Sequence, residues 1–387
     1  MKKSFSLALR RAQLRPSPSF RLIPIADVAE LDRRNLPDAG RESGWAGALA
    51  PTEPGWRRAQ LVGAETVGLL ESVARLRAAP AGCDDQVIAR LLLDGVLELE
   101  WNGGCVSGPA AHPLCFASRP PRSRGWLGRL SLHALEYAAA LGVHRPRTLA
   151  ERLYRYNTLP ASPQWRRRLP DAAAVARLVA GRSARVRVSR GWTTFTSADP
   201  GAPVWEVWER TGAPEPAPGR PTYKLYLSPE VTGVGDASRA LRALPPACAP
   251  FALKQGGDLV TLLRSEKVVA YYTGLDELRE AADRLATSLR GMRAQGVPFT
   301  VELGGSGLLS WGADPGDFAE PPGPLRQTSW RRWITARLGT ALASALSAGA
   351  PVPAWQYALD RVSLDGVDPR SWTPPAWFWE NGSRVAH

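Results

Sequence analysis

The chain has 387 residues and a formal net charge of +13, from 49 lysine and arginine residues against 36 aspartate and glutamate residues. Its hydrophobic fraction of 44% and its 15 tryptophans exclude a disordered protein, and no apolar run reaches the roughly 18 residues that predict a transmembrane helix. The length suffices for two domains, and the charge predicts an anionic partner: nucleic acid, a membrane surface, or a phosphorylated or acidic substrate.

Residues 1–60 are rich in proline, glycine and arginine and show no sustained periodicity, so we predict an irregular arm. The chain starts in the manner of a signal peptide, but Arg10, Arg11 and Arg15 interrupt its short apolar run. This interruption argues against a signal peptide.

The four cysteines show no CxxC pairing, which predicts free thiols in a reducing, cytoplasmic setting. They are Cys83, Cys105, Cys115 and Cys248. Cys105, His112 and Cys115 offer part of a zinc ligand set, but their spacing matches no common zinc pattern. Buried thiols and a loop histidine are therefore the favoured interpretation, and we expect no metal or organic cofactor.

Residues 61–183 predict a mainly helical domain with one β-hairpin. Apolar residues recur at helical spacing over 61–77. Residues 84–108 then read as a helix, a strand at 96–101, an "NGG" turn and a short return strand, because Asn-Gly between apolar runs favours a hairpin. The combination indicates a winged-helix-like element, and two more helices are expected within 131–156. The charge run at 164–171 is interpreted as a solvated face.

Residues 184–387 predict an α+β domain built on an antiparallel sheet. Alternating or β-branched and aromatic stretches indicate its strands. They are residues 184–192, 203–210, 222–228, 267–272 and 298–303. Helical spacing is seen over 274–292 and 330–346, whereas the tail "SWTPPAWFWENGS" is too rich in proline and tryptophan for a regular element.

Lysine is rare in this arginine-rich chain: there are five, and three of them fall between residues 224 and 267. In "TYKLYLS", Lys224 and Tyr226 share one face of a strand. A lysine that is partly desolvated among other cations has a lowered pKa and supplies a neutral amine, whereas arginine does not deprotonate. The competing interpretation is a surface strand with an extended lysine and a packed tyrosine.

The segments "YKLYLSP" (223–229), "PFALK" (250–254), "LLRSEKVVAYY" (262–272) and "GVPFTVEL" (296–303) together resemble the phosphothreonine lyases. They are also similar to the lyase domains of lanthipeptide synthetases, and most of all to stand-alone (class V-like) lyases of lanthipeptide-type clusters. The resemblance covers roughly residues 190–345. Tyr226 stands where the family usually has a histidine, which is the main departure.

The resemblance implies β-elimination of phosphate from phosphoserine or phosphothreonine, which gives dehydroalanine or dehydrobutyrine without a cofactor. It implies that Lys224 abstracts the α-proton and that Tyr226 protonates or hydrogen-bonds the departing phosphate. Lys254 or Lys267 would supply the cation that the developing enolate requires.

Arginine grips a phosphate dianion through bidentate hydrogen bonds. Arg264, close before Lys267, is the first candidate for this role, and Arg331 and Arg332 follow.

Two kinds of function remain open from the sequence. The first is a lyase that matures a ribosomally made precursor peptide; it requires a separate Ser/Thr kinase, because the chain has no kinase motifs. The second is a non-catalytic scaffold for a phosphorylated or acidic peptide or for the kinase. Nucleic-acid binding ranks last because no base-reading helix is recognisable, and an aromatic prenyltransferase would need Lys-x-Tyr pairs on several strands.

Overall fold

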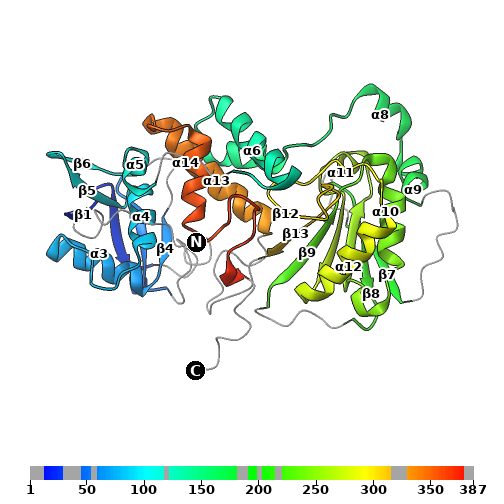
Figure 1. Ribbon diagram of the computed structural model, residues 1–387, viewed down its shortest axis with the longest axis horizontal. Coiled ribbons are helices and arrows are strands. Elements are labelled where there is room, and N and C mark those ends of the chain that lie inside the picture. The colour runs from blue at the N-terminus through cyan, green and yellow to red at the C-terminus, as the bar shows by residue number, and fades with distance from the viewer. Residues whose placement is uncertain are drawn as a thin grey trace.

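The computed structural model describes residues 13–28, 45–53, 59–116, 122–180, 191–197, 203–213, 220–314 and 329–378. Two lobes lie side by side along its long axis (Figure 1). Helices and antiparallel sheets are combined in one mixed architecture, with the large sheet in the C-terminal half. The predicted α+β fold class is therefore confirmed.

The N-terminal lobe contains two small antiparallel sheets, ordered β1-β5-β6 and β2-β3-β4. Their strands are β1 (Leu14–Pro16), β2 (Phe20–Pro24), β3 (Gly47–Pro51), β4 (Gln60–Val62), β5 (Leu97–Trp101) and β6 (Gly104–Val106). The helices beside them are α3 (Ala64–Leu76), α4 (Asp85–Leu93) and α5 (His112–Cys115). The predicted hairpin is confirmed, because Asn102 (φ 51°) and Gly103 (φ 78°) form the turn between β5 and β6.

The prediction of an irregular N-terminal arm is wrong for the described part of residues 1–60. Strands β1, β2 and β3 lie there, and Leu14 pairs with Leu99 of the distant β5. These strands are only three to five residues long. Such short segments leave no periodicity in the sequence, because their stability comes from pairing with remote segments.

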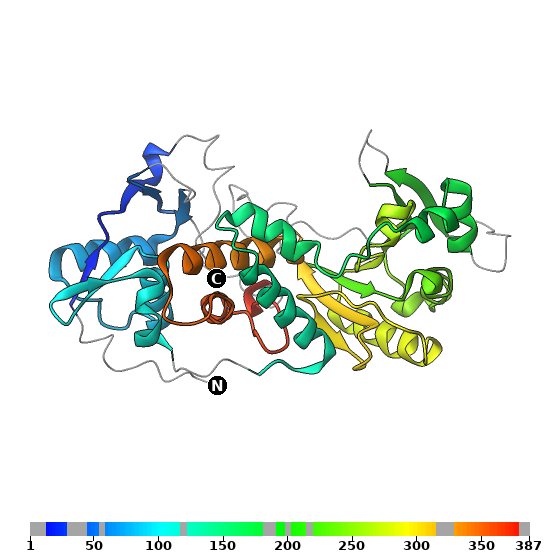
Figure 2. The same cartoon turned by 90° about the horizontal axis from the view of Figure 1, so that it is seen from above.

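The C-terminal helices return to the N-terminal lobe. Helices α13 (Trp330–Ala348) and α14 (Ala354–Ser363) share one hydrophobic core with α6 (Gly125–Ala140), α7 (Pro146–Tyr154) and residues 14–115. Figure 2 shows α13, in orange, reaching from this core toward the sheet. A division of the chain at residue 184 therefore separates segments that are packed together.

The C-terminal lobe is a seven-stranded antiparallel sheet in the order β12-β13-β9-β11-β10-β8-β7. The strands are β7 (Trp192–Ser197), β8 (Trp205–Arg210), β9 (Thr222–Leu227), β10 (Ala252–Gly256), β11 (Val268–Tyr272), β12 (Val301–Leu303) and β13 (Leu309–Asp314). Its helices are α8 (Pro163–Arg168), α9 (Ala172–Ala180), α10 (Val234–Arg242), α11 (Leu259–Leu262) and α12 (Leu275–Ser288). Helices α10 and α12 cover one face of the sheet and bury a second hydrophobic core there (Figure 1).

Most of the elements predicted for residues 184–387 are present. The strands expected at 203–210, 222–228 and 267–272 and the helices expected at 274–292 and 330–346 are confirmed as β8, β9, β11, α12 and α13. Of the strand expected at 298–303, only 301–303 is extended, and most of the strand expected at 184–192 lies outside the described residues. Strands β7, β10 and β13 and helices α8, α9, α11 and α14 were not predicted as such.

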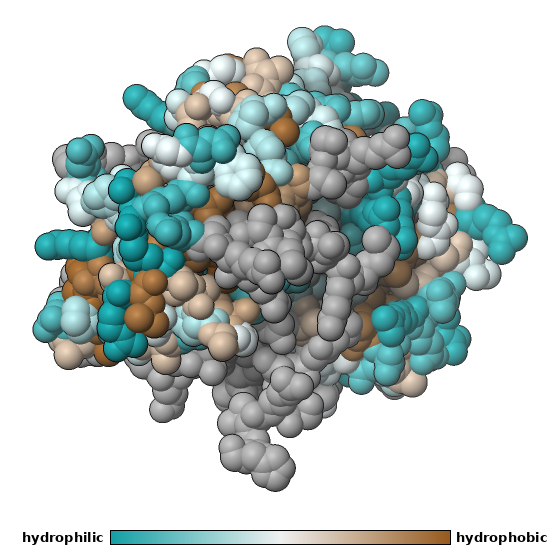
Figure 3. Space-filling view, turned by 60° about the vertical axis from the view of Figure 1, so that its left-hand side comes forward, coloured by the Kyte–Doolittle hydropathy of each residue, from teal (hydrophilic) through white to brown (hydrophobic). Residues whose placement is uncertain are grey.

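None of the described helices is long and apolar enough to cross a bilayer. On the face drawn in Figure 3, hydrophilic side chains are distributed over the described surface, with smaller hydrophobic patches between them.

Candidate functional site

Lys224 and Tyr226 lie on the face of the large sheet that α10 and α12 do not cover. Their neighbours along β9 belong to the core beneath those helices; they are Tyr223, Leu225 and Leu227. Side chains alternate along a strand, so Lys224 and Tyr226 stand together on the opposite face. This is the arrangement predicted from the sequence.

The amine of Lys224 forms an ion pair with the carboxylate of Asp314 at the end of β13. The Lys224 Nζ also lies 5.3 Å from the ring centroid of Tyr271, its register partner on β11. Asp314 is itself fixed, because its Oδ1 accepts a hydrogen bond of 2.8 Å from the main-chain N–H of Trp330. These contacts fix the Lys224 amine between Asp314 of β13 and Tyr271 of β11.

Lys254 faces the same side from β10, in a different electrostatic setting. Its Nζ lies 4.5 Å from the ring centroid of Trp205, and no described carboxylate forms an ion pair with it. Burial lowers the pKa of Lys254, and the neighbouring cations Lys224 and Arg264 lower it further, against the opposing effect of Glu266. The two lysines of this face therefore differ: Lys224 is ion-paired with a carboxylate, whereas Lys254 is desolvated and has a lowered pKa.

The buried carboxylate of Glu266 connects the site to the N-terminal lobe. Its Oε1 accepts a hydrogen bond of 2.7 Å from the Tyr154 hydroxyl and pairs with Arg264, and its Oε2 lies 2.7 Å from Arg331 Nη1. Burial by itself would raise the pKa of Glu266, but Arg331, Arg264 and Lys254 outweigh it and lower that pKa to about 2. Glu266 is thus anionic at neutral pH and holds the surrounding cations in place.

The side chain of Arg331 is buried in the protein interior. Its side chain is 1% exposed, and its Nη1 donates to Glu266. Its Nη2 donates to the carbonyl of Tyr154 at 2.8 Å and its Nε to the carbonyl of Pro298 at 3.3 Å. With these donors in use, Arg331 positions Glu266 and joins α13 to α7.

Arg264 and Arg332 flank the ring of Tyr154 at the border of the site. Their guanidinium carbons lie 5.4 Å and 5.1 Å from its centroid, and Arg264 also lies 5.5 Å from the ring of Trp205. Arg264 is partly accessible and Arg332 is exposed. These two arginines, unlike Arg331, are not fully buried, so an incoming anion can approach their side chains.

Tyr226 is 2% exposed beneath this cluster. Burial raises its pKa well above the usual value, and the negative charges of Asp314 and Glu266 act in the same direction. The hydroxyl therefore stays protonated at neutral pH and is available as a hydrogen-bond donor.

Lys267 lies apart from the other predicted site residues. Its Nζ is buried and donates to the carbonyl of Pro229 at 2.9 Å and to Oε1 of Gln295. Gln295 in turn donates to the carbonyls of Asn157 at 2.6 Å and Leu263 at 3.2 Å. Burial lowers the pKa of Lys267 to about 7. These contacts join several loops and give Lys267 a structural environment.

The structure thus brings six of the seven predicted residues into one cluster, which we call the lysine face. They are Lys224, Tyr226, Lys254, Arg264, Arg331 and Arg332. Sequence reasoning missed Tyr154, Trp205, Glu266 and Asp314. Glu266 left a signal, because it is a lone acid between Arg264 and Lys267 in an otherwise apolar stretch. Asp314 left none.

The residues considered for zinc are not gathered into a metal site. Cys105 is exposed on the hairpin, and burial raises the pKa of the Cys115 thiol to about 12. His112 Nε2 lies 2.9 Å from Asp360 Oδ2 in the core. Within the described ranges, no group of three His, Cys, Asp or Glu side chains is arranged to hold a metal ion, and the four cysteines are free.

No family model and no curated protein matches this chain. Solved structures similar to it include an effector protein from Pseudomonas syringae pv. tomato strain DC3000, at 12% identity over 64% of this chain and 97% of the other, with a TM-score of 0.38. An effector protein from Pseudomonas syringae pv. syringae strain 61 is similar at 11% identity over 63% and 97%, with a TM-score of 0.36. The type III effector and phosphothreonine lyase OspF from Shigella flexneri is similar at 14% identity over 30% and 68%, with a TM-score of 0.26. The functional argument therefore rests on the side chains of the lysine face.

Proposed function

We propose that this protein is a lyase that eliminates phosphate from phosphoserine or phosphothreonine in a ribosomally made precursor peptide. The observation that carries the proposal is the pair of lysines on one sheet face in different electrostatic surroundings. Lys224 is ion-paired with Asp314, and Lys254 is desolvated beside other cations. Proton abstraction next to a carbonyl group requires a base and a cation that stabilises the developing charge, and we assign these two roles to the two lysines.

In the proposed reaction, Lys254 is the base. Its neutral amine takes the α-proton, the Cα–Cβ double bond forms, and the Cβ–O bond breaks with its electron pair leaving on phosphate. Lys224 stabilises the negative charge that develops on the carbonyl oxygen. This exchanges the roles that the family resemblance implied for Lys224 and Lys254, because Lys224 is ion-paired with Asp314 whereas burial lowers the pKa of Lys254.

The phosphate is bound by the two accessible arginines of the lysine face, Arg264 and Arg332. Arg331 and Glu266 act as positioning residues behind them. Tyr226 keeps its proton and donates a hydrogen bond to the departing oxygen; the released phosphate takes up a proton from solvent, and the Lys254 ammonium returns one to solvent. A separate kinase supplies the phosphorylated peptide, and no cofactor takes part in these steps.

A direct test incubates the full chain with a phosphothreonine peptide and follows loss of the mass of phosphoric acid. Lys254→Arg should reduce the rate by about 100-fold or more, because arginine stays protonated. Lys224→Arg keeps a cation at its position and should lose less. Arg293→Lys, an exposed substitution, serves as the control.

The outcomes separate the alternatives. If Lys224→Arg abolishes turnover and Lys254→Arg does not, the base is Lys224. If the phosphopeptide binds to the wild-type protein without any turnover, the lyase proposal fails and the scaffold function is favoured.

A further inference from the structure

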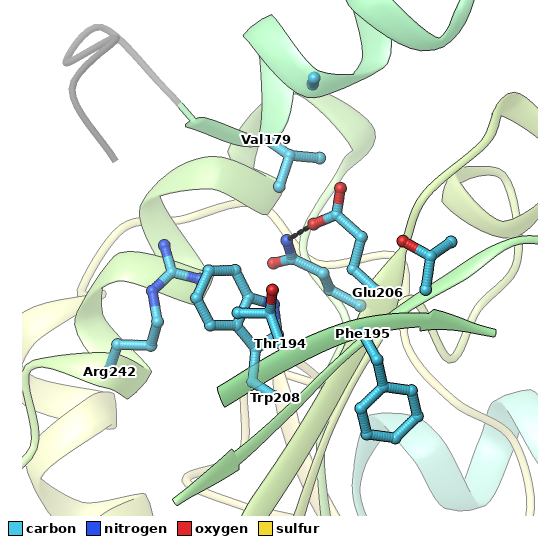
Figure 4. A pocket seen from close by; sticks show the side chains of 9 residues that line it. Val179, Thr194, Phe195, Glu206, Trp208 and Arg242 are labelled. Atoms are coloured by element: carbon cyan, nitrogen blue, oxygen red, sulfur yellow. Dashed lines mark hydrogen bonds between the residues drawn. The ribbon is translucent and has the colours of Figure 1, made fainter. Parts of the chain in front are cut away.

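A pocket of about 260 Å³ lies on the opposite side of the same sheet from the lysine face. It is formed between α9, the end of α10 and strands β7, β8 and β10 (Figure 4). The residues that matter for its chemistry are Val179, Thr194, Glu206, Trp208, Arg242 and Gln255. None of them takes part in the proposed elimination, so this pocket requires an explanation of its own.

Two hydrogen-bond donors at the pocket have no acceptor among the residues that the structure describes. The Arg242 guanidinium lies 5.0 Å from the ring centroid of Trp208, and Figure 4 shows the two side chains next to each other while Phe195 points away from them. Arg242 Nη1 and Trp208 Nε1 are both buried, and neither finds a hydrogen-bond partner among the described residues. Buried polar groups are nearly always paired, so two orphan donors beside one pocket indicate a missing acceptor.

The opposite wall of the pocket carries a fixed carboxylate. Ser238 Oγ donates to Gln255 Oε1 at 2.6 Å, and Gln255 Nε2 donates to Glu206 Oε2 at 2.5 Å. This relay holds the carboxylate of Glu206 in place. In the described part of the chain no hydrogen bond reaches its Oε1, which leaves one acceptor for a donor from a ligand.

The charges restrict the ligand. Arg242 contributes one positive charge and Glu206 one negative charge, so a phosphate dianion would leave two uncompensated negative charges in the pocket, whereas a carboxylate leaves one. A carboxylate that carries an N–H group nearby satisfies both walls at once. That combination occurs in an aspartate or glutamate residue of a peptide.

We propose that this pocket binds an acidic residue of a peptide ligand. The carboxylate of that residue accepts hydrogen bonds from Arg242 Nη1 and Trp208 Nε1, and its amide N–H donates to Glu206. Val179 and the Trp208 ring enclose the methylene groups. The proposal is independent of the elimination reaction, because it uses the other face of the sheet.

The test titrates the full chain, labelled with ¹⁵N-tryptophan, with N-acetyl-glutamate methylamide and N-acetyl-aspartate methylamide. The Trp208 indole resonance is assigned from Trp208→Phe. We expect a saturable shift of this resonance with at least one acidic probe and none with N-acetyl-glutamine methylamide. Equal shifts from the glutamine probe, no shift from either acidic probe, or tighter binding of inorganic phosphate would overturn the proposal.

Substitutions of Arg242 test whether the acidic probes bind in this pocket. Arg242→Met and Arg242→Gln should each weaken binding about tenfold or more, because a charge-assisted hydrogen bond is lost. Arg239→Met, on the same helix but exposed, should bind as wild type. Unchanged positions of the remaining indole resonances show that each variant is folded. Wild-type affinity in folded Arg242 variants would rule out this site.

Discussion

Glu266 and Lys267 are adjacent in the chain and both buried, yet their surroundings differ. Glu266 is enclosed by guanidinium groups and an amine, which outweigh burial and lower its pKa to about 2. The Lys267 amine meets two oxygen acceptors, and burial lowers its pKa to about 7 despite the opposing effect of Glu230. Each shift makes a separate prediction about stability.

Glu266→Gln should lower the free energy of unfolding at pH 7 by about 3–5 kcal/mol, because it leaves Arg331 buried without its counter-charge. Ionised Glu266 stabilises the folded state above the ordinary glutamate pKa of about 4.3, and this contribution is lost as the pH falls toward 2. The difference between wild type and variant should therefore narrow in acid. Denaturant unfolding at pH 7, 5 and 3 measures it.

The control is Glu280→Gln, which removes an exposed pair with Arg284 and should change stability by less than about 1 kcal/mol. If Glu266→Gln is as mild as this control, the carboxylate does not organise the lysine face.

Lys267→Met should remove part of the pH dependence of the free energy of unfolding at alkaline pH. Between the folded pKa of about 7 and the ordinary lysine value of about 10.4, the unfolded chain binds a proton that the folded chain does not. The stability of the wild type should therefore rise with pH over this window, relative to the variant, by up to about 1.4 kcal/mol per pH unit. Parallel stability profiles from pH 7 to 10 would contradict the buried position of this amine.

At the scale of elements, the approach of α13 to β13 depends on a glycine. Gly312 lies opposite Lys224 in the sheet, and a Cβ there would come within 2.5 Å of the Trp330 ring. The indole is held at this place by a hydrogen bond of 2.8 Å from its Nε1 to the carbonyl of Phe299. The first turn of α13 therefore has little freedom to move away.

Gly312→Ala should accordingly lower the free energy of unfolding by about 1–3 kcal/mol through overpacking. Gly68→Ala in α3 is the matched control, since nothing lies within 4 Å of its added Cβ, and it should stabilise by up to about 1 kcal/mol. Thermal or denaturant unfolding of both variants measures the contrast. Equal changes in the free energy of unfolding for the two variants would show that the Trp330 ring does not require a glycine at position 312.

The sequence predicted those elements whose patterns are local. "TYKLYLS" alternates with period two, so β9 and the shared face of Lys224 and Tyr226 followed from it. In β13, "LSWGAD" combines a glycine and an aspartate with few β-formers, and the strand was missed. The partner of Lys224 could not be predicted either, because Asp314 reaches it only through the pairing of β13 with β9.

At the scale of the whole molecule, the N-terminal lobe is completed by the end of the chain. Its core contains residues from α13 and α14 beside those of α4, α6 and α7. Buried charges follow the same pattern: Arg361 of α14 donates to both carboxylate oxygens of Asp94, at 2.6 and 2.7 Å. The sequence pattern of residues 61–183 did not indicate that α13 and α14 pack into this core.

A fragment of residues 1–183 should therefore lack a cooperative unfolding transition, since part of its core would be missing. Adding residues 329–387 in trans should restore near-native circular dichroism and tryptophan fluorescence. A fragment that folds alone, with a sharp thermal transition, would show that the two halves are independent domains.

The back-to-back placement of the lysine face and the pocket has a consequence for how this protein tolerates mutation. Trp205 and Lys254 point to one side of the sheet, and the next residues, Glu206 and Gln255, point to the other. Adding or deleting a single residue inside β8 or β10 would turn every following side chain through the sheet and exchange the two sets. Homologous chains should therefore differ here by replacement of residues, while changes in length accumulate in the connecting loops.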